Sequence, residues 1–364
     1  MIMKRLVPVL LCWPLAAGAM DAGQTNSIQT LTLTEAQRLA LKNHPQIAAA
    51  NYRALAAREA VVGTRAGFFP NVNLYGTAVG ADSEDTRILA GGLNNPSVFD
   101  RAAGGLEVSQ LLTDFGRTAN LTASSKYQAQ AENQNANATR EQVVLGADTA
   151  FFGALEAQAV LRVARQTLDT RRLLCDQVTA LATNKLRSEL DVSFAQVELE
   201  QARLLVEKSQ NDADAAMATL STALGYRELH QFQLVESKNA GPLADASTND
   251  VSDLIQTALS HRPELLSLRD ERDAALRFAK AERDSRLPTV AAVGVAGASP
   301  AHDSHLPDNY AAGGVQLSLP LFAGGLYISR QREAELKAEA DDELLRSLEN
   351  NVIRDVHLAW LNVK

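Results

Sequence analysis

The ten residues "GFFPNVNLYG" at positions 67–76 mark a change from helical to strand periodicity. After Pro70, apolar and polar residues alternate with period two, beginning at Val72 and Asn73. Before it, apolar or small residues recur at steps of three and four, which is the spacing of a helical packing seam, at Ile47, Ala50, Ala54, Ala57, Val61, Thr64 and Phe68. Proline has no amide hydrogen and ends a helical ladder. We therefore predict a helix over about residues 46–67 and a helix-to-strand junction at Pro70.

The same junction occurs a second time, as "SRLPTVAAVG" at residues 285–294 with Pro288 at its centre. Around it, "LTEAQRLALKNHPQI" from residue 33 aligns with "VSDLIQTALSHRPEL" from residue 251, and "GGLEVSQLLTDFGR" from residue 104 aligns with "GGVQLSLPLFAGGL" from residue 313. The paired stretches are separated by more than 200 residues (33 and 251, 104 and 313), which is far longer than a solenoid repeat. The spacing therefore indicates a duplicated half-molecule. We expect a first structural repeat over 20–226, a linker or equatorial segment over 227–250, and a second, incomplete repeat over 251–364.

Each repeat contains two segments that alternate like strands, at about 71–81 and 104–113 in the first repeat and about 289–298 and 312–322 in the second. In the last segment the apolar positions are Val315, Leu317, Leu319 and Leu321. A length of about ten residues is what a tilted strand needs to cross a bilayer. The alternation alone fits two structures equally well, namely an ordinary half-buried hairpin and a barrel with lipid outside and water inside.

The helices favour the second structure. The segment 117–181 contains no proline, and about 65 helical residues would span on the order of 100 Å. A return helix over 189–225 carries its own seam and ends at Gly225, a C-cap residue; the seam consists of Val192, Ala195, Leu199, Ala202, Val206, Ser209, Ala213, Ala216, Leu220 and Ala223. A short first helix begins at Thr34, with Gln37 completing a capping box. The fold class is therefore mainly α with transmembrane β: long antiparallel coiled-coil helices plus four strands.

The N-terminus and the composition place the chain outside the cytoplasm and away from nucleic acid. Residues 1–19 have a basic start, a short apolar run and a small-x-small end, as in a signal peptide. Removal of this signal peptide leaves one cysteine, Cys175, and a single cysteine excludes a disulfide framework. The net charge of −8 and the pI near 5.4 do not fit a nucleic-acid partner.

No pattern indicates an enzyme, a cofactor site or a metal site. His302 and His305 have a metal-like spacing, but no cysteine or further histidine stands nearby, so we interpret them as part of a solvated loop. The chain has no GxSxG, HExxH or phosphate-binding glycine loop.

The order of these motifs resembles the TolC-like outer-membrane channel proteins over nearly all of the mature chain. The resemblance is carried by "LTLTEAQRLALKNHPQI", "TRAGFFPNVNLYG", "LLTDFGR", "SELDVSFAQVELEQARL", "LSTALGY" and "LPLFAGGL". It implies a homotrimer in the outer membrane of a Gram-negative-type bacterium, with four strands per protomer in one lipid-embedded β-barrel and the helices in a periplasmic α-barrel. The expected function is a passive exit duct in a tripartite efflux pump or type I secretion system. Its expected partners are a periplasmic adaptor (membrane fusion) protein and an inner-membrane transporter.

Two alternatives stay open at this point. One is a soluble periplasmic coiled-coil adaptor or binding protein. The other is a non-functional truncated channel fragment, because the second repeat stops at Lys364, opposite Leu155, and counterparts of residues 156–226 are absent. We expect a truncated gene product or a fragment with an incomplete tunnel wall.

The resemblance also implies a docking site for adaptors at the turn between the long helix and its return. The residues are Lys185, Leu186, Arg187, Ser188 and Asp191, and Lys185 stands where the family often has glycine. Ser188 can cap the return helix, and Asp191 suits the positive end of that helix. The simpler interpretation is that these residues only turn the chain.

Overall fold

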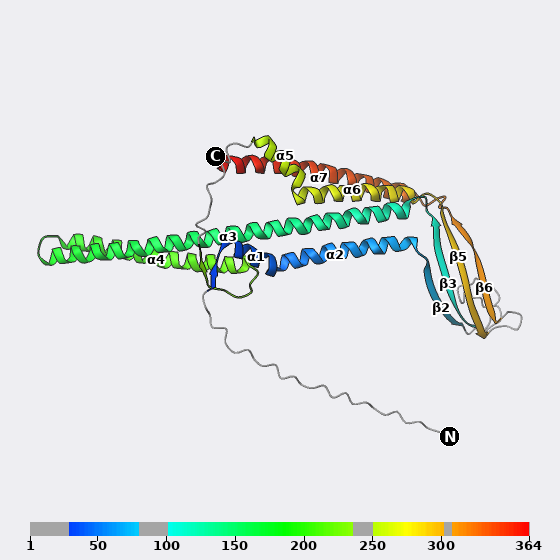
Figure 1. The fold of residues 1–364 in the computed structure, drawn as a ribbon, viewed down its shortest axis with the longest axis horizontal. Helices are drawn as coiled ribbons and strands as arrows, with labels where there is room; N and C mark the ends of the chain where they lie inside the picture. Colours follow the sequence, from blue (N-terminus) through cyan, green and yellow to red (C-terminus); the bar gives the residue numbers. More distant parts are fainter. Residues whose placement is uncertain (1–28, 80–100, 236–249, 302–307, 364) are drawn as a thin grey trace, which may run out of the picture.

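The computed structural model describes residues 29–79, 101–235, 250–301 and 308–363. The expected signal peptide, His302 and His305 lie outside these residues. The elements form an elongated molecule with a sheet at one end and a helical hairpin at the other (Figure 1).

The sheet contains four antiparallel strands in the order β2 (Asn71–Val79), β3 (Arg101–Thr113), β5 (Thr289–Ala301) and β6 (Asn309–Ser318). The hairpins of the two sequence repeats meet where β3 pairs with β5. Strand β6 ends at Ser318, so the predicted extension to residue 322 through Leu319 and Leu321 is wrong. Ser318 pairs with Thr289, the first residue of β5, and Pro320 has no amide hydrogen with which to continue a ladder.

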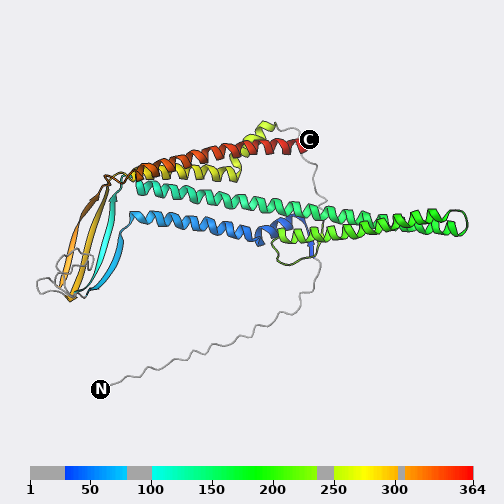
Figure 2. The same ribbon diagram turned by 180° about the vertical axis from the view of Figure 1, so that it is seen from behind.

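Four helices run from the sheet and lie side by side: α2 (Pro45–Arg65), α3 (Arg117–Thr183), α6 (Pro263–Asp284) and α7 (Leu326–Val363). Both views in Figures 1 and 2 show α4 (Glu189–Ala223) returning along the far part of α3, beyond the end of α2. The 67 residues of α3 correspond to a helix of about 100 Å. Helices α2 and α4 therefore cover successive parts of one long partner.

A short 3₁₀ turn, η1 (Ala66–Phe68), separates α2 from β2. The predicted α2 seam holds for Ile47, Ala50 and Ala54, which are buried. It is wrong for Phe68, whose side chain is 44% exposed because the chain has left the α-helical repeat there. The α4 seam is correct throughout, since all its predicted members are buried or half-buried.

The first helix, α1 (Leu33–Asn43), begins two residues earlier than its predicted cap implies. Thr32 is the N-cap: its hydroxyl accepts from the Glu35 N–H at 3.3 Å, and the Glu35 carboxylate accepts from the Thr32 N–H. The predicted box of Thr34 and Gln37 is therefore wrong. Gln37 instead donates to both oxygens of Asp148 on α3, at 2.8 and 3.0 Å, and ties α1 to the long helix.

The main apolar cluster lies where α1, α3 and α4 meet the small parallel pair of β1 (Gln29–Leu31) and β4 (Phe232–Leu234). Its largest fully buried side chains include Phe151, Leu220 and Leu224. A second cluster, Leu265, Leu345 and Val352, lies between α6 and α7, next to α5 (Val251–His261). Elsewhere the helices meet through small residues, such as Ala50 and Ala54 against Ala136.

Cys175 is buried and unbonded on α3. Within the described residues, α3 is also the one helix that is long and apolar enough, by length and composition, to cross a membrane. It packs along α2, α4 and α6, which makes it the central member of the helical layer.

Candidate functional site: the two sheet faces and the helical tip

The register of the sheet places most of the valine and leucine residues of β2, β3 and β6 on one side, together with Val290 of β5, whereas Val293 and Val295 of β5 lie on the other side. Val72 is opposite Val108, and Leu74 is opposite Leu106. The apolar face defined by this register includes Val72, Leu74, Gly76, Ala78, Gly104, Leu106, Val108, Val290, Ala292, Gly294, Ala296, Ala298, Ala311, Gly313, Val315 and Leu317. The register also places Gln110 and Asn309, near the ends of their strands, on this face. Leu74 is 79% exposed and Val315 is 70% exposed, so the described residues leave these side chains of the face uncovered.

The opposite side, the polar face, includes Asn71, Asn73, Tyr75, Thr77, Glu107, Ser109, Thr289, Tyr310, Gln316 and Ser318. The period-two alternation expected from the sequence is thereby confirmed for β2, for residues 106–109 of β3 and for residues 315–318 of β6. A sheet with one exposed apolar face and one polar face fits a surface between lipid and water. No such arrangement is needed for a hairpin packed against a protein core.

The two prolines lie at the ends of helices that face the sheet. Pro70 lies between η1 and β2, and Pro288 lies between α6 and β5. Just before each of them a backbone hydrogen bond closes the last turn, from Phe69 N–H to Ala66 O and from Leu287 N–H to Asp284 O, both at 2.9 Å. Each proline follows as the first residue beyond the turn, where the backbone becomes extended.

At the far end, α3 passes into α4 through a tight turn. Lys185 has a positive φ of 60°, and its N–H donates to Ala182 O at 2.9 Å, while Leu186 N–H donates to Leu181 O at 2.9 Å. This pair of bonds is a Schellman motif, in which the left-handed position is usually glycine. The sequence shows Lys185 where the family often has glycine, but the sequence alone does not indicate this backbone geometry.

The five predicted tip residues divide into two groups. Ser188 and Asp191 form a reciprocal capping box, with N–H to side-chain oxygen distances of 3.2 Å in both directions. Their polar atoms are thus engaged in starting α4. Leu186 is 70% exposed, and the exposed Arg187 guanidinium lies 3.9 Å from the Asp191 carboxylate. The outward surface of the tip is therefore made by Leu186, Arg187 and the Lys185 side chain.

Replacing Lys185 by glycine is expected to stabilise the tip, because glycine carries no side-chain penalty in the left-handed conformation. The gain should be about 0.5–1 kcal/mol after the greater flexibility of unfolded glycine is subtracted. Hydrogen exchange at the Leu186 amide reports the change, since that amide closes the motif. Lys185→Ala keeps the strained conformation and serves as the control; equal protection in both variants would contradict this account.

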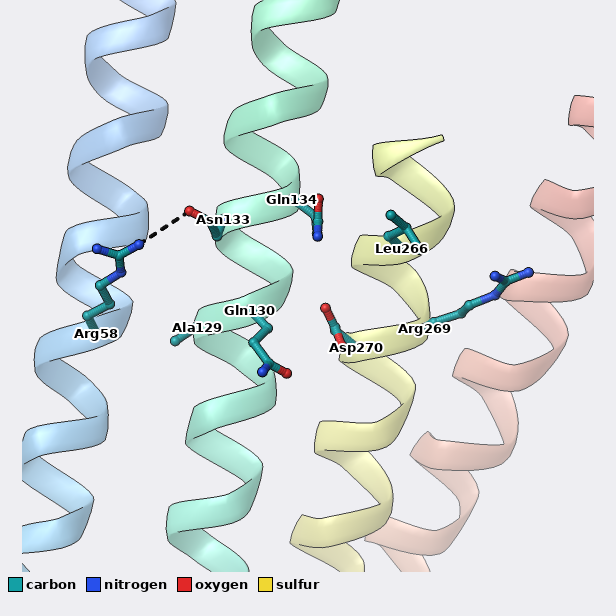
Figure 3. Close-up of a pocket in the computed structure, with 8 residues that line it drawn as sticks. All are labelled: Arg58, Ala129, Gln130, Asn133, Gln134, Leu266, Arg269 and Asp270. Atoms are coloured by element: carbon teal, nitrogen blue, oxygen red, sulfur yellow. Dashed lines mark hydrogen bonds between the residues drawn. The ribbon is translucent and has the colours of Figure 1, made fainter. Parts of the chain in front are cut away.

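A hollow of about 600 Å³ lies over α2, α3 and α6. Arg58 on α2 donates to Asn133 on α3 at 3.4 Å, while Arg269 extends towards α7, where it pairs with Glu349 at 2.9 Å (Figure 3). Burial, and then the nearby Asp273 carboxylate, raise the pKa of Asp270 above the usual aspartate range. Among the described residues no group of three or more potential ligands could hold a metal ion. The hollow is an open surface groove rather than a reaction centre.

Known proteins match this chain over most of its length. The family profile described as "Outer membrane efflux protein" matches residues 36–226 and 254–364. Outer membrane protein TolC of Escherichia coli (strain K12) is 24% identical over 378 residues, which cover 99% of this chain and 72% of TolC. Alkaline protease secretion protein AprF of Pseudomonas aeruginosa is 27% identical over 340 residues, which cover 88% of this chain and 68% of AprF.

Solved structures show the same fold at low identity. The outer-membrane channel OprN superposes with a TM-score of 0.74 at 19% identity, covering 91% of this chain and 73% of OprN. The Campylobacter jejuni outer membrane channel CmeC superposes with a TM-score of 0.71 at 17% identity, covering 95% of this chain and 75% of CmeC.

Proposed function

Because the chain belongs to the outer membrane efflux protein family, we propose that three copies of it close a single channel through the outer membrane. The protein is an efflux channel of the TolC and AprF type, without enzymatic activity, and its helical part lies in the periplasm. The copy number, the contacts between copies and the adaptor contacts are the proposed part.

The open edges of the sheet support assembly through the strands. Strands β2 and β6 are the two edge strands of the sheet, so among the described residues each has a neighbouring strand on one side only. Unpaired backbone groups are costly in a bilayer, so the sheet must close on itself. Four strands cannot do so, because the smallest membrane barrels have eight.

The number of strands favours three copies over two. Two copies would supply eight strands, and side chains fill the interior of a barrel of that size. Three copies would supply twelve, which leaves room for a passage lined by the polar face. The apolar face would then contact lipid around the whole circumference.

Exposed apolar side chains on the helices support contacts between copies as well. Val163 and Leu173 on α3 are exposed, as are Phe194 and Leu204 on α4. A helical hairpin that projects alone into water would carry this apolar area at a cost. Packing against the helices of neighbouring copies removes it from water.

A disulfide scan between the edge strands tests the assembly. Within one copy β2 and β6 are separated by two strands, so their Cα atoms lie about 14 Å apart and no disulfide can join them. Thr77→Cys is combined in turn with Ala312→Cys, Gly314→Cys or Gln316→Cys in a Cys175→Ser background. At least one pair should give a covalent trimer on oxidation of outer membranes, whereas each single variant should not. Monomers from all three pairs would contradict the proposal.

We assign adaptor docking to the tip, with Leu186 and Arg187 as the contacting side chains and Ser188 and Asp191 as the residues that shape the turn. Two observations support this assignment. Ser188 and Asp191 hydrogen-bond to each other at the start of α4, whereas the Leu186 side chain is exposed. In this arrangement substrates pass from an inner-membrane transporter into the tunnel without chemical change.

Replacing Leu186 by aspartate is expected to disrupt export, because a charge at the centre of a small apolar contact leaves an unpaired group at the interface. Loss of such a contact typically costs about 2 kcal/mol or more, or roughly 30-fold in affinity. The measurement is drug tolerance, over a panel of compounds, of a strain that has only the variant gene. Leu229→Asp is the matched control, because Leu229 is also an exposed leucine (56%, against 70% for Leu186) and lies between α4 and β4. Normal tolerance of L186D with normal membrane levels would refute docking at Leu186.

A further inference from the structure

The polar face of the sheet carries a single negatively charged residue, Glu107, among the described strand residues. We propose that the three copies of Glu107 form a carboxylate ring in the barrel lumen and make the channel select for cations. The inference rests on the trimeric barrel proposed above, because only closure turns this face into a lumen.

The register fixes the position of Glu107. It pairs with Asn73 on β2 and with Val295 on β5, in the middle of β3. Its side chain is half-exposed, and no described residue forms a hydrogen bond or an ion pair with its carboxylate. An exposed, uncompensated charge in a passage acts on the ions that pass it.

The neighbouring row of the polar face is made of two tyrosines and two glycines. That row contains Tyr75, Gly105, Gly297 and Tyr310, one on each strand. A Cβ placed on Gly105 or Gly297 would clash with the Tyr310 hydroxyl, so the Tyr310 side chain lies flat across the two glycines. The ring therefore covers the backbone of the two central strands in the row next to Glu107.

Among the described strand residues, no other charged residue lies on the polar face at the level of Glu107. The remaining charged position on the polar face is Arg101, six residues along β3 and about 20 Å away at strand spacing. That separation is more than twice the screening length at physiological salt. The apolar face carries no charged residue, and the lipid behind it has a low dielectric constant, which confines the field of the three carboxylates to the lumen.

Reversal potentials measure the selectivity directly. The full-length channel is inserted into neutral planar bilayers under a potassium chloride gradient near 0.15 M, and the ratio of potassium to chloride permeability is calculated. Glu107→Gln is expected to lower this ratio by about threefold, as three screened charges at roughly 10 Å predict. Glu107→Asp should retain the wild-type ratio, and Glu107→Lys should shift it further towards chloride. Glu228→Gln, the same change at an exposed position between α4 and β4, should have no effect.

The outcomes separate this inference from the assembly on which it rests. Wild-type conductance with an unchanged ratio in Glu107→Gln would overturn the selectivity ring and leave the trimeric channel intact. Absence of conductance from the wild-type protein would refute the channel itself, and the ring with it. A ratio that changes in Glu107→Asp as much as in Glu107→Gln would show that shape, and not charge, is responsible, which would also overturn the inference.

Discussion

Replacing Gly225 by alanine is expected to destabilise the protein by about 2–5 kcal/mol. Gly225 follows α4 with a φ of +83°, in a Schellman motif closed by bonds from its own N–H to Thr222 O at 2.9 Å and from Tyr226 N–H to Ser221 O at 3.0 Å. Alanine would be strained in that conformation. Its Cβ would also lie 2.8 Å from backbone atoms of Asn43 and 2.9 Å from His44 N, closer than such atoms approach.

The clash is with backbone, so no side-chain rotation relieves it. Asn43 and His44 form the junction of α1 with α2, and this junction holds α1 against the main apolar cluster. The measurement is denaturant unfolding of the purified protein in detergent. Gly63→Ala is the matched control: Gly63 lies inside α2, nothing stands within 4 Å of the place that an alanine methyl would take, and alanine there should stabilise by about 0.5–1 kcal/mol. Similar effects in the two variants would show that the α4 end does not pack on the α1–α2 junction.

Replacing Leu74 by arginine is expected to cost about 2–4 kcal/mol in membrane-inserted stability, the range for a cation on the lipid face of a barrel near the bilayer centre. Leu74 lies on the apolar face and pairs with Leu106. In a soluble protein the same substitution at an exposed leucine would cost little. The measurement is unfolding in lipid vesicles, together with the amount of trimer in the outer membrane.

Asn73→Arg is the control for this prediction, because it introduces the same side chain one position earlier in the same strand. Asn73 lies on the polar face opposite Glu107, so arginine there should be tolerated. If the two variants lose equal stability, the two faces do not differ in environment. Soluble, folded L74R in the periplasm would favour the alternative of a water-exposed hairpin.

Much of this fold was predictable because two independent patterns repeat. The alternation around Val72 and Val315 indicated the strand faces, and the recurrence of the proline junction at Pro288 indicated the second half. The long uninterrupted segment predicted α3 to within two residues of its observed end at Thr183. These features are periodic, so each residue supports the assignment of its neighbours.

The errors concern features that depend on a single position or a distant partner. Thr34 and Gln37 have the spacing of a capping box, but so do Thr32 and Glu35, and the pairing of β1 with β4 leads the chain into α1 at Thr32. The end of β6 depends on where its partner β5 begins, which alternation does not reveal.

In the candidate site, too, periodic patterns predicted some features, while features that depend on one position or on a distant partner were missed. The tip was found from the polar break between two helical patterns, yet the left-handed Lys185 has no signature in a sequence of this kind. The surroundings of Glu107 could not be predicted at all. They arise from the pairing of β3 with β5, which brings Gly105 beside Gly297 from the other half of the chain and under Tyr310 from β6.

The central claim is that the apolar face of the sheet contacts lipid while the polar face contacts water. Nitroxide labels at positions 72, 73, 74 and 75 of β2, in a Cys175→Ser background in outer-membrane vesicles, test it most directly. Collisions with oxygen should dominate at 72 and 74, and collisions with a water-soluble nickel chelate should dominate at 73 and 75. Equal access of the nickel chelate to all four positions would contradict the account.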